Sequence, residues 1–195
     1  MSRPREFDYT EVISKITQLF WEKGFAGTSL DDIMRATRLK KGSLYSSFGN
    51  KEKLFGLALK HYAARGPAQP ERGAGAVATL VLLYRKLIAE AASPAGRRRG
   101  CLIFNSGLEF GAERSRLTAP VLAEVERLER FFRNLLLTAR KDGEIPKRID
   151  PRKAAGRAFA AAFTIREISK FKPEPDFLRD IADRALESIG TDKRV

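Results

Sequence analysis

Residues 40–48 carry hydrogen-bonding side chains at spacings that suit recognition of a polar surface. Leu44 and Phe48 are four residues apart, so a helix would turn both toward one buried inner face. Gly42 costs a helix roughly 1 kcal/mol relative to alanine, which is reasonable where the backbone must approach another molecule closely. Hydroxyl and ammonium groups suit the edges of DNA bases and phosphate oxygens. The outward or flanking positions that supply them are Lys41, Ser43, Tyr45, Ser46 and Ser47.

Residues that usually perform catalysis or bind metals are scarce. The chain has one cysteine, Cys101, and one histidine, His61. These counts exclude an intramolecular disulfide, a cysteine-cluster metal site and any site that needs two imidazoles. No paired acidic motif supplies a general acid and a general base. We therefore expect neither an enzyme nor a metal site, and no cofactor.

Composition favours a folded protein with a polyanionic partner. Hydrophobic residues make up 43% of the 195 residues and aromatic residues 9%, which is enough for a buried core. Lysine and arginine outnumber aspartate and glutamate 37 to 24, so the net charge is +13 at pH 7, which favours nucleic acid or an anionic membrane surface. Charged residues interrupt every long apolar stretch, and the first residues lack the apolar core of a signal peptide. We therefore expect a cytoplasmic protein that does not enter the membrane.

Apolar residues recur at helical spacing along nearly the whole chain, and alternating strand patterns with hairpin turns are missing. The sequence thus predicts an all-α protein. A proline- and glycine-rich stretch at 65–73 is the expected loop between two functional halves. The expected helices span about 8–23, 29–36, 40–48, 50–62, 76–91, 102–110, 117–141, 151–169 and 176–189.

The second and third predicted helices are short, and a turn of only three residues, 37–39, joins them. Ser29 and Asp32 have the spacing of a capping box, which would begin the second helix. Two short helices braced by a longer first helix form a helix-turn-helix, which offers its second helix to the DNA major groove.

The residues of this region resemble the DNA-binding domain of the TetR family of transcriptional repressors. The resemblance is carried by GFAGTSLDDI at 24–33 and KGSLYSSFGNKE at 41–52, whose joint spacing is more specific than a lone helix-turn-helix. It implies an N-terminal three-helix helix-turn-helix DNA-binding domain, here residues 1–50. A helical ligand-binding and dimerisation domain, here residues 51–195, would follow.

The resemblance also implies roles for individual residues. The residues expected to contact phosphates are Thr28, Tyr45 and Lys51. The residues expected to approach bases are Lys41, Gly42, Ser43 and Ser46. The chain departs from the family at Arg38, where a turn glycine is usual, and at Lys40, where a small capping hydroxyl is usual. Both departures add positive charge beside the expected DNA.

Simpler interpretations stay open for several residues. Leu44 and Phe48 are expected to be core and nothing more. Tyr45 could be a half-buried packing residue, and Lys41 a solvated lysine. His61 is expected to cap the end of its helix or to be exposed, with a proton switch as the alternative.

Members of the family are homodimers whose last two helices pair with their symmetry mates. The predicted helix at 151–169 is rich in small residues that allow close packing, Ala158 and Ala162 among them. We expect a homodimer through this helix and the one at 176–189, although the last helix could instead be intramolecular core. Two copies would read a palindromic double-stranded DNA operator in two half-sites.

Repressors of this family are usually released from DNA by a small-molecule inducer that enters the second domain. The sequence does not identify the inducer. Aromatic residues in a helical bundle are more often core than pocket lining. The candidate ligand-binding residues are Tyr84, Cys101, Phe104, Leu108, Phe131 and Phe163.

Cys101 admits two interpretations. It follows Arg97-Arg98-Arg99-Gly100 and opens a helix, and guanidinium groups and helix amides both stabilise a reactive thiolate. Some relatives with a similar Gly-Cys-Leu stretch are regulated through cysteine. The apolar residues after Cys101 instead favour a buried, structural thiol.

Two functions fit the sequence. The first is a ligand-responsive, dimeric transcriptional repressor. The second is a DNA-bound architectural or adaptor protein that needs no inducer. A closed, aromatic-lined cavity in the second domain would favour the first, and a filled core with an exposed apolar patch would favour the second.

Overall fold

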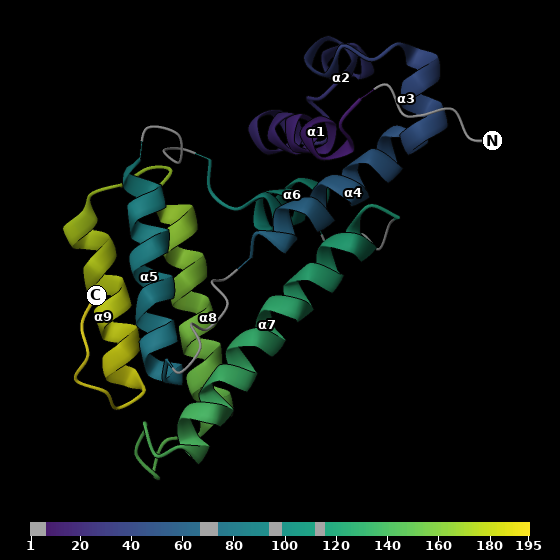
Figure 1. Ribbon diagram of the computed structural model, residues 1–195. Helices are drawn as coiled ribbons and strands as arrows, with labels where there is room; N and C mark the ends of the chain where they lie inside the picture. The colour runs from purple at the N-terminus through teal and green to yellow at the C-terminus, as the bar shows by residue number, and fades with distance from the viewer. Residues whose placement is uncertain (1–6, 67–73, 94–98, 112–115) are drawn as a thin grey trace. The chain divides into compact units, whose positions relative to one another are not determined.

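The computed structural model describes residues 7–66, 74–93, 99–111 and 116–195, and these form α-helices without any strand (Figure 1). The all-α architecture that the sequence predicts is confirmed, and each helix begins and ends within two residues of its predicted bounds. None of the helices in these ranges combines the length and apolar character that a membrane crossing requires. The helices are α1 (Tyr9–Lys23), α2 (Leu30–Thr37), α3 (Lys41–Phe48), α4 (Lys51–Ala64), α5 (Ala76–Ala92), α6 (Leu102–Phe110), α7 (Thr118–Lys141), α8 (Pro151–Ile168) and α9 (Pro175–Ser188).

Contacts within the chain divide it into two compact units. The first unit comprises Met1–Gly66 and Leu102–Glu124, and the second comprises Pro67–Cys101 and Val125–Val195. The first unit therefore holds α1 to α4, α6 and the start of α7, while the second holds α5, the rest of α7, α8 and α9. The division of function that the sequence predicts at residue 50 stays a prediction.

The first unit is built on α1, which packs against both α4 and α2. The carboxylate of Asp8 starts α1 by accepting hydrogen bonds from the amides of Thr10 (2.7 Å) and Glu11 (3.2 Å). Apolar side chains from the first four helices then close over one another away from water. The buried side chains of this core include Ile16, Phe20, Ile33, Leu44, Phe48, Leu54, Phe55 and Leu59.

The second unit is a helical bundle in which α5, α8 and α9 pack against one another (Figure 1). The phenol of Tyr84 on α5 is fully buried and donates a hydrogen bond to the carbonyl of Ala158 on α8 (3.0 Å). This burial raises the pKa of Tyr84 well above its ordinary value. Tyr84 thus ties two helices of the bundle through one neutral hydrogen bond.

The small residues of α8 serve packing inside this unit. Ala158 and Ala162 are both buried within the single chain, which does not fit the prediction that they form the contact between subunits. Their short side chains let α5 and α9 approach α8 closely. The exposed side of α8 instead carries Gly156, Ala160 and Thr164.

The turn between α2 and α3 has a left-handed residue, although an arginine stands where a glycine is usual. Arg38 has φ 61° and ψ 18°, the left-handed conformation, and it is the one non-glycine residue with positive φ in the described ranges. Its amide donates to the carbonyl of Met34 (2.8 Å), which closes α2. The chain therefore holds an arginine in a conformation that costs L-residues roughly 1–2 kcal/mol.

We predict that Arg38→Gly raises the free energy of unfolding by about 1 kcal/mol, because glycine adopts this conformation without strain. Urea unfolding of the full chain, followed by the fluorescence of Trp21 in α1, measures the change. Arg35→Gly is the matched control, since it places glycine inside α2 and should lower the free energy of unfolding by about 1 kcal/mol. Equal effects of the two changes would contradict the argument from strain.

Candidate nucleic-acid interface

The helix-turn-helix begins with the capping box that the sequence predicts. The hydroxyl of Ser29 accepts from the amide of Asp32 (3.0 Å), and the carboxylate of Asp32 accepts from the amide of Ser29 (3.1 Å). The ammonium of Lys23, at the end of α1, lies 2.9 Å from the same carboxylate. These contacts set where α2 starts relative to α1.

Asp32 is held in its charged form by its neighbours. The hydrogen bond from Lys23 and those from the Ser29 amide and hydroxyl lower the pKa of Asp32 well below its ordinary value of 3.8. The carboxylate therefore stays ionised in all but strongly acidic solution.

The inner face of α3 anchors it to the first unit. Leu44 and Phe48 are buried, and the ring of Tyr9 stacks on the ring of Phe48 with centroids 5.1 Å apart. Both residues are core, as predicted. Because this side of α3 is buried, its opposite side must face solvent.

The outer face of α3 is polar and exposed. Tyr45 is 40% exposed, so part of its side chain is open to solvent. The hydroxyl of Ser46 donates to the carbonyl of Ser43 (3.2 Å) and remains at the surface. The exposed residues of this face and the adjoining turn are Arg38, Lys40, Lys41, Gly42, Ser43, Tyr45 and Ser46.

Gly42 leaves open space at the surface of α3. A Cβ atom at this position would meet no other atom of the chain within 4 Å, and its φ is not positive. Neither internal packing nor backbone conformation therefore requires a glycine here. Without a side chain here, the backbone of α3 is open to close approach from outside.

The start of α3 also lacks a side-chain cap. Lys40 occupies the N-cap position and makes no capping hydrogen bond with its side chain. The first amides of α3 thus add partial positive charge to the ammonium groups of Lys40 and Lys41. This end of the helix suits an anionic partner.

Thr28 does not reach the surface. Its side chain is fully buried, and its hydroxyl donates to the carbonyl of Gly24 (2.7 Å). In this conformation it braces the loop before α2, so the phosphate contact expected for its side chain does not fit the geometry. The hydrogen bond to the Gly24 carbonyl holds the side chain inward.

Lys51 lies at the first position of α4. The side chain of Asn50 accepts from the amide of Lys53 (2.9 Å) and thereby caps this helix. The ammonium of Lys51 lies 4.4 Å from the ring centroid of Phe25, which positions the cation without neutralising it.

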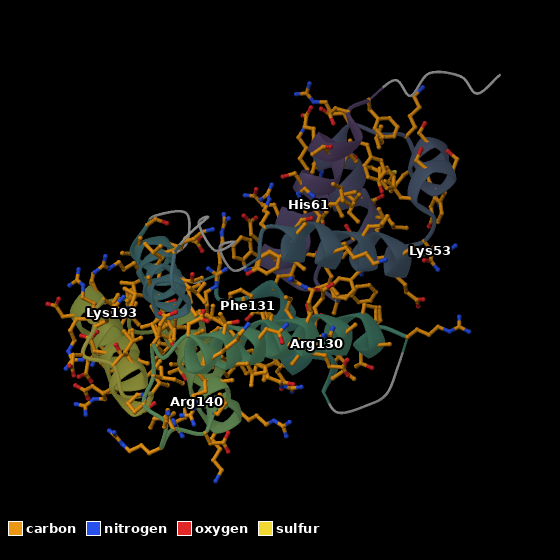
Figure 2. All side chains as sticks on the ribbon, turned by 60° about the horizontal axis from the view of Figure 1, so that its bottom comes forward. Lys53, His61, Arg130, Phe131, Arg140 and Lys193 are labelled. Carbon is orange, nitrogen blue, oxygen red and sulfur yellow. The ribbon has the colours of Figure 1, made fainter. Side chains whose placement is uncertain are left out.

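His61 lies near the C-terminal end of α4, and Lys53 lies near its N-terminal end (Figure 2). It is half-buried, and within the described ranges its Nε2 has no hydrogen-bond partner. Burial and the charge of Arg65 lower its pKa, which works against a protonated C-terminal cap.

The candidate ligand-binding residues divide between the two units. Phe104 and Leu108 lie on α6 in the first unit, where Leu108 is 73% exposed. Tyr84 and Cys101 are buried in the second unit. Phe131, labelled on α7 in Figure 2, and Phe163 are half-buried there. Their role in binding a ligand stays a prediction.

Cys101 is buried, and its amide donates to the carboxylate of Glu167 on α8 (2.8 Å). Burial favours the structural interpretation of this thiol over the reactive one. Arg97 and Arg98, which the reactive interpretation invokes, lie outside the described residues.

Comparison with known families identifies both parts of the chain. Residues 12–58 match the bacterial regulatory proteins of the tetR family, and residues 76–184 match the tetracyclin repressor-like C-terminal domain. The chain belongs to the TetR family. This TetR-family chain is 30% identical over 152 residues to the HTH-type transcriptional repressor ComR of Escherichia coli K12, which covers 76% of the chain and 72% of ComR.

Solved TetR-family structures have the same fold. A cysteine mutant of the TetR family transcriptional regulator CifR, complexed with a 26-bp double-strand operator DNA, superposes with a TM-score of 0.82 at 28% identity, over 95% of this chain and 99% of that chain. A regulatory protein TetR from Rhodobacter sphaeroides superposes with a TM-score of 0.78 at 27% identity, over 92% and 97% of the two chains. The helix-turn-helix and the helical second half are thus those of TetR-family regulators.

The capping box predicts acid sensitivity. Since the pKa of Asp32 is lower in the folded chain than its unfolded value of about 3.8, its contribution to stability is present above that value and is lost as the pH falls below it. We predict that Asp32→Asn lowers stability at pH 7 and flattens the acid side of the pH–stability curve, measured by urea unfolding with Trp21 fluorescence. Asp31→Asn, at an exposed neighbour outside the capping box, should keep the wild-type curve. A curve for Asp32→Asn as steep as wild type would count against this assignment.

Proposed function

We propose that this TetR-family protein is a transcriptional repressor that binds a palindromic operator as a homodimer in the cytoplasm. A small-molecule inducer in the second half of the chain releases it. The observation that carries the DNA-binding part is α3, whose apolar side is buried while its polar side and uncapped first turn are exposed.

Charge supports DNA as the partner of this face. Arg38, Lys40 and Lys41 are exposed around the turn and the first residue of α3, and the chain as a whole carries +13. Cations at such positions displace counterions from phosphates, so affinity should fall steeply with salt. The fixed polar groups of α3 would then select bases in the major groove.

The relatives support the same function. The name of ComR describes a transcriptional repressor, and CifR is complexed with operator DNA in its solved structure. We extend both properties to this chain because the likeness covers its helix-turn-helix as well as its second half.

We predict that substitutions divide into two classes by their effect on DNA binding. Tyr45→Ala and Lys51→Ala should weaken binding to all duplexes alike because they remove phosphate contacts. Lys41→Ala and Ser43→Ala should change which bases are preferred, with losses of about 1–3 kcal/mol at the affected positions. Fluorescence anisotropy over a salt series, on duplexes selected by the wild-type protein, separates the classes.

Lys86→Ala is the control for the loss of one positive charge, since Lys86 is an exposed lysine of α5 in the second unit. It should leave base preference unchanged. Salt-independent binding, or four interface variants that all behave like Lys86→Ala, would contradict the proposed interface.

We propose that the dimer forms through the exposed sides of α8 and α9, because Ala158 and Ala162 are buried within one chain. The exposed side of α8 has Gly156 and Ala160 four residues apart, small enough to admit a helix of the second copy. Half-buried Phe177 and Ile181 on α9 supply apolar area.

We predict that Ala160→Glu yields a folded monomer with greatly weakened operator binding, because one copy reads too few base pairs. Light scattering measures the mass, and circular dichroism checks the helix content. Ala89→Glu, at an exposed position of α5, is the matched control and should remain dimeric. A dimeric Ala160→Glu protein would refute this interface.

The response of the DNA complex to a small-molecule inducer distinguishes a repressor from an adaptor. A regulator of the proposed kind loses operator affinity when its small molecule binds, whereas an adaptor keeps its DNA in the presence of any metabolite. Screening a metabolite library against the preformed complex of protein and selected duplex compares the two. Release by a compound that also raises the melting temperature of the free protein supports the repressor.

A further inference from the structure

Glu109, near the end of α6, holds the loop between α1 and α2. Its two carboxylate oxygens accept hydrogen bonds from consecutive amides, those of Phe25 (2.9 Å) and Ala26 (2.6 Å). All three residues belong to the first unit. A charged acceptor that binds two adjacent amides fixes both the position and the orientation of that peptide segment.

The loop has room for this carboxylate because Gly24 lacks a side chain. A Cβ atom on Gly24 would lie 2.8 Å from the Oε2 atom of Glu109, closer than real Cβ contacts occur. Gly24 also has φ +72°, which favours glycine. The start of the Gly24-Phe25-Ala26 segment is thus shaped around the carboxylate.

Aromatic contacts reinforce the same connection. The ring of Phe110, which follows Glu109, packs edge-on against Phe25 (centroids 5.7 Å apart) and against Phe55 of α4 (5.4 Å). Phe25 in turn carries the ammonium of Lys51 over its ring. The end of α6 is therefore bound both to the loop before α2 and to α4.

This loop leads directly into the helix-turn-helix, so its position determines where α2 begins. The buried hydroxyl of Thr28 donates to the carbonyl of Gly24, and the next residue, Ser29, caps α2. Since α2 leads through a three-residue turn to α3, a displaced loop would displace the exposed face of α3.

We propose that Glu109 is a positioning residue for DNA recognition. By fixing the loop before α2, its carboxylate sets the orientation in which α3 meets the operator, although Glu109 itself supplies no donor to DNA. The proposal rests on the operator binding proposed above.

Electrostatics alone predicts the opposite effect of removing Glu109. Deleting a negative charge from a DNA-binding unit should strengthen its attraction to phosphates. Loss of the contact with the loop amides should instead weaken binding to the operator. The direction of the change therefore separates the two effects.

Glu144 provides a matched control within the same chain. Its carboxylate oxygens accept from the consecutive amides of Ala76 (2.8 Å) and Val77 (2.9 Å) at the start of α5, and a Cβ on Gly75 would lie 2.7 Å from Glu144. The chemistry and the charge are the same as at Glu109, but the contact lies in the second unit.

The test compares Glu109→Ala, Glu109→Gln and Glu144→Ala in the full chain. The probe is the duplex that the wild-type protein selects from a random library, with a scrambled duplex of equal length as the non-specific reference. We expect Glu109→Ala to bind the selected duplex about 10-fold more weakly, and the scrambled duplex as tightly as wild type or more tightly. Glu109→Gln, which keeps one acceptor oxygen, should fall between, and Glu144→Ala should stay within about twofold of wild type.

A second measurement keeps the test independent of stability. Amide hydrogen exchange at Phe25 and Ala26 should accelerate in both Glu109 variants at a temperature where the chain is folded, and remain as in wild type in Glu144→Ala. Selected-duplex affinity in Glu109→Ala equal to or above that of Glu144→Ala would overturn the proposal. Failure of the wild-type protein to select any duplex would instead overturn the proposed function.

Discussion

The burial of one side of α3 is the constraint on which the rest of the first unit depends. A helix of eight residues is too short to be stable alone in water, so α3 exists because Leu44 and Phe48 are buried in the core of the first unit. That burial leaves the polar side of α3 exposed as one surface. The packing of Leu44 and Phe48 thus orients the residues of α3 that are expected to read DNA. Those residues stay at the surface and take no part in the packing themselves.

Backbone geometry around α2 then sets where this surface lies. The capping box of Ser29 and Asp32 starts the helix, and the left-handed Arg38 ends it. The carboxylate of Glu109 in turn holds the loop that leads into α2. A binding surface that combines few contacts with specificity needs such fixed geometry, because small displacements misalign several hydrogen bonds together.

Much of this arrangement could be predicted from residues near one another in sequence. Helix bounds, the capping box and the core role of Leu44 and Phe48 all follow from side-chain period and local hydrogen bonding, which act within one or two turns. Two predictions do not fit the structure. Thr28 and Ala158 have types that suit contact with a partner, but both are buried within the chain. The hydroxyl of Thr28 donates to the nearby carbonyl of Gly24, and the carbonyl of Ala158 accepts from the distant Tyr84.

The sequence by itself determined the helices, their caps, the helix-turn-helix and the polar side of α3, since these depend on neighbours within a few residues. Only the tertiary structure decided that Glu109 meets the amide of Phe25 across 84 positions, and that Tyr84 bonds to Ala158 across 74. Such contacts leave no local signal, because a glutamate on an exposed helix face has the same pattern whether or not a distant loop packs beside it. Their partners are chosen by how the helices pack, and packing is a property of the whole folded unit.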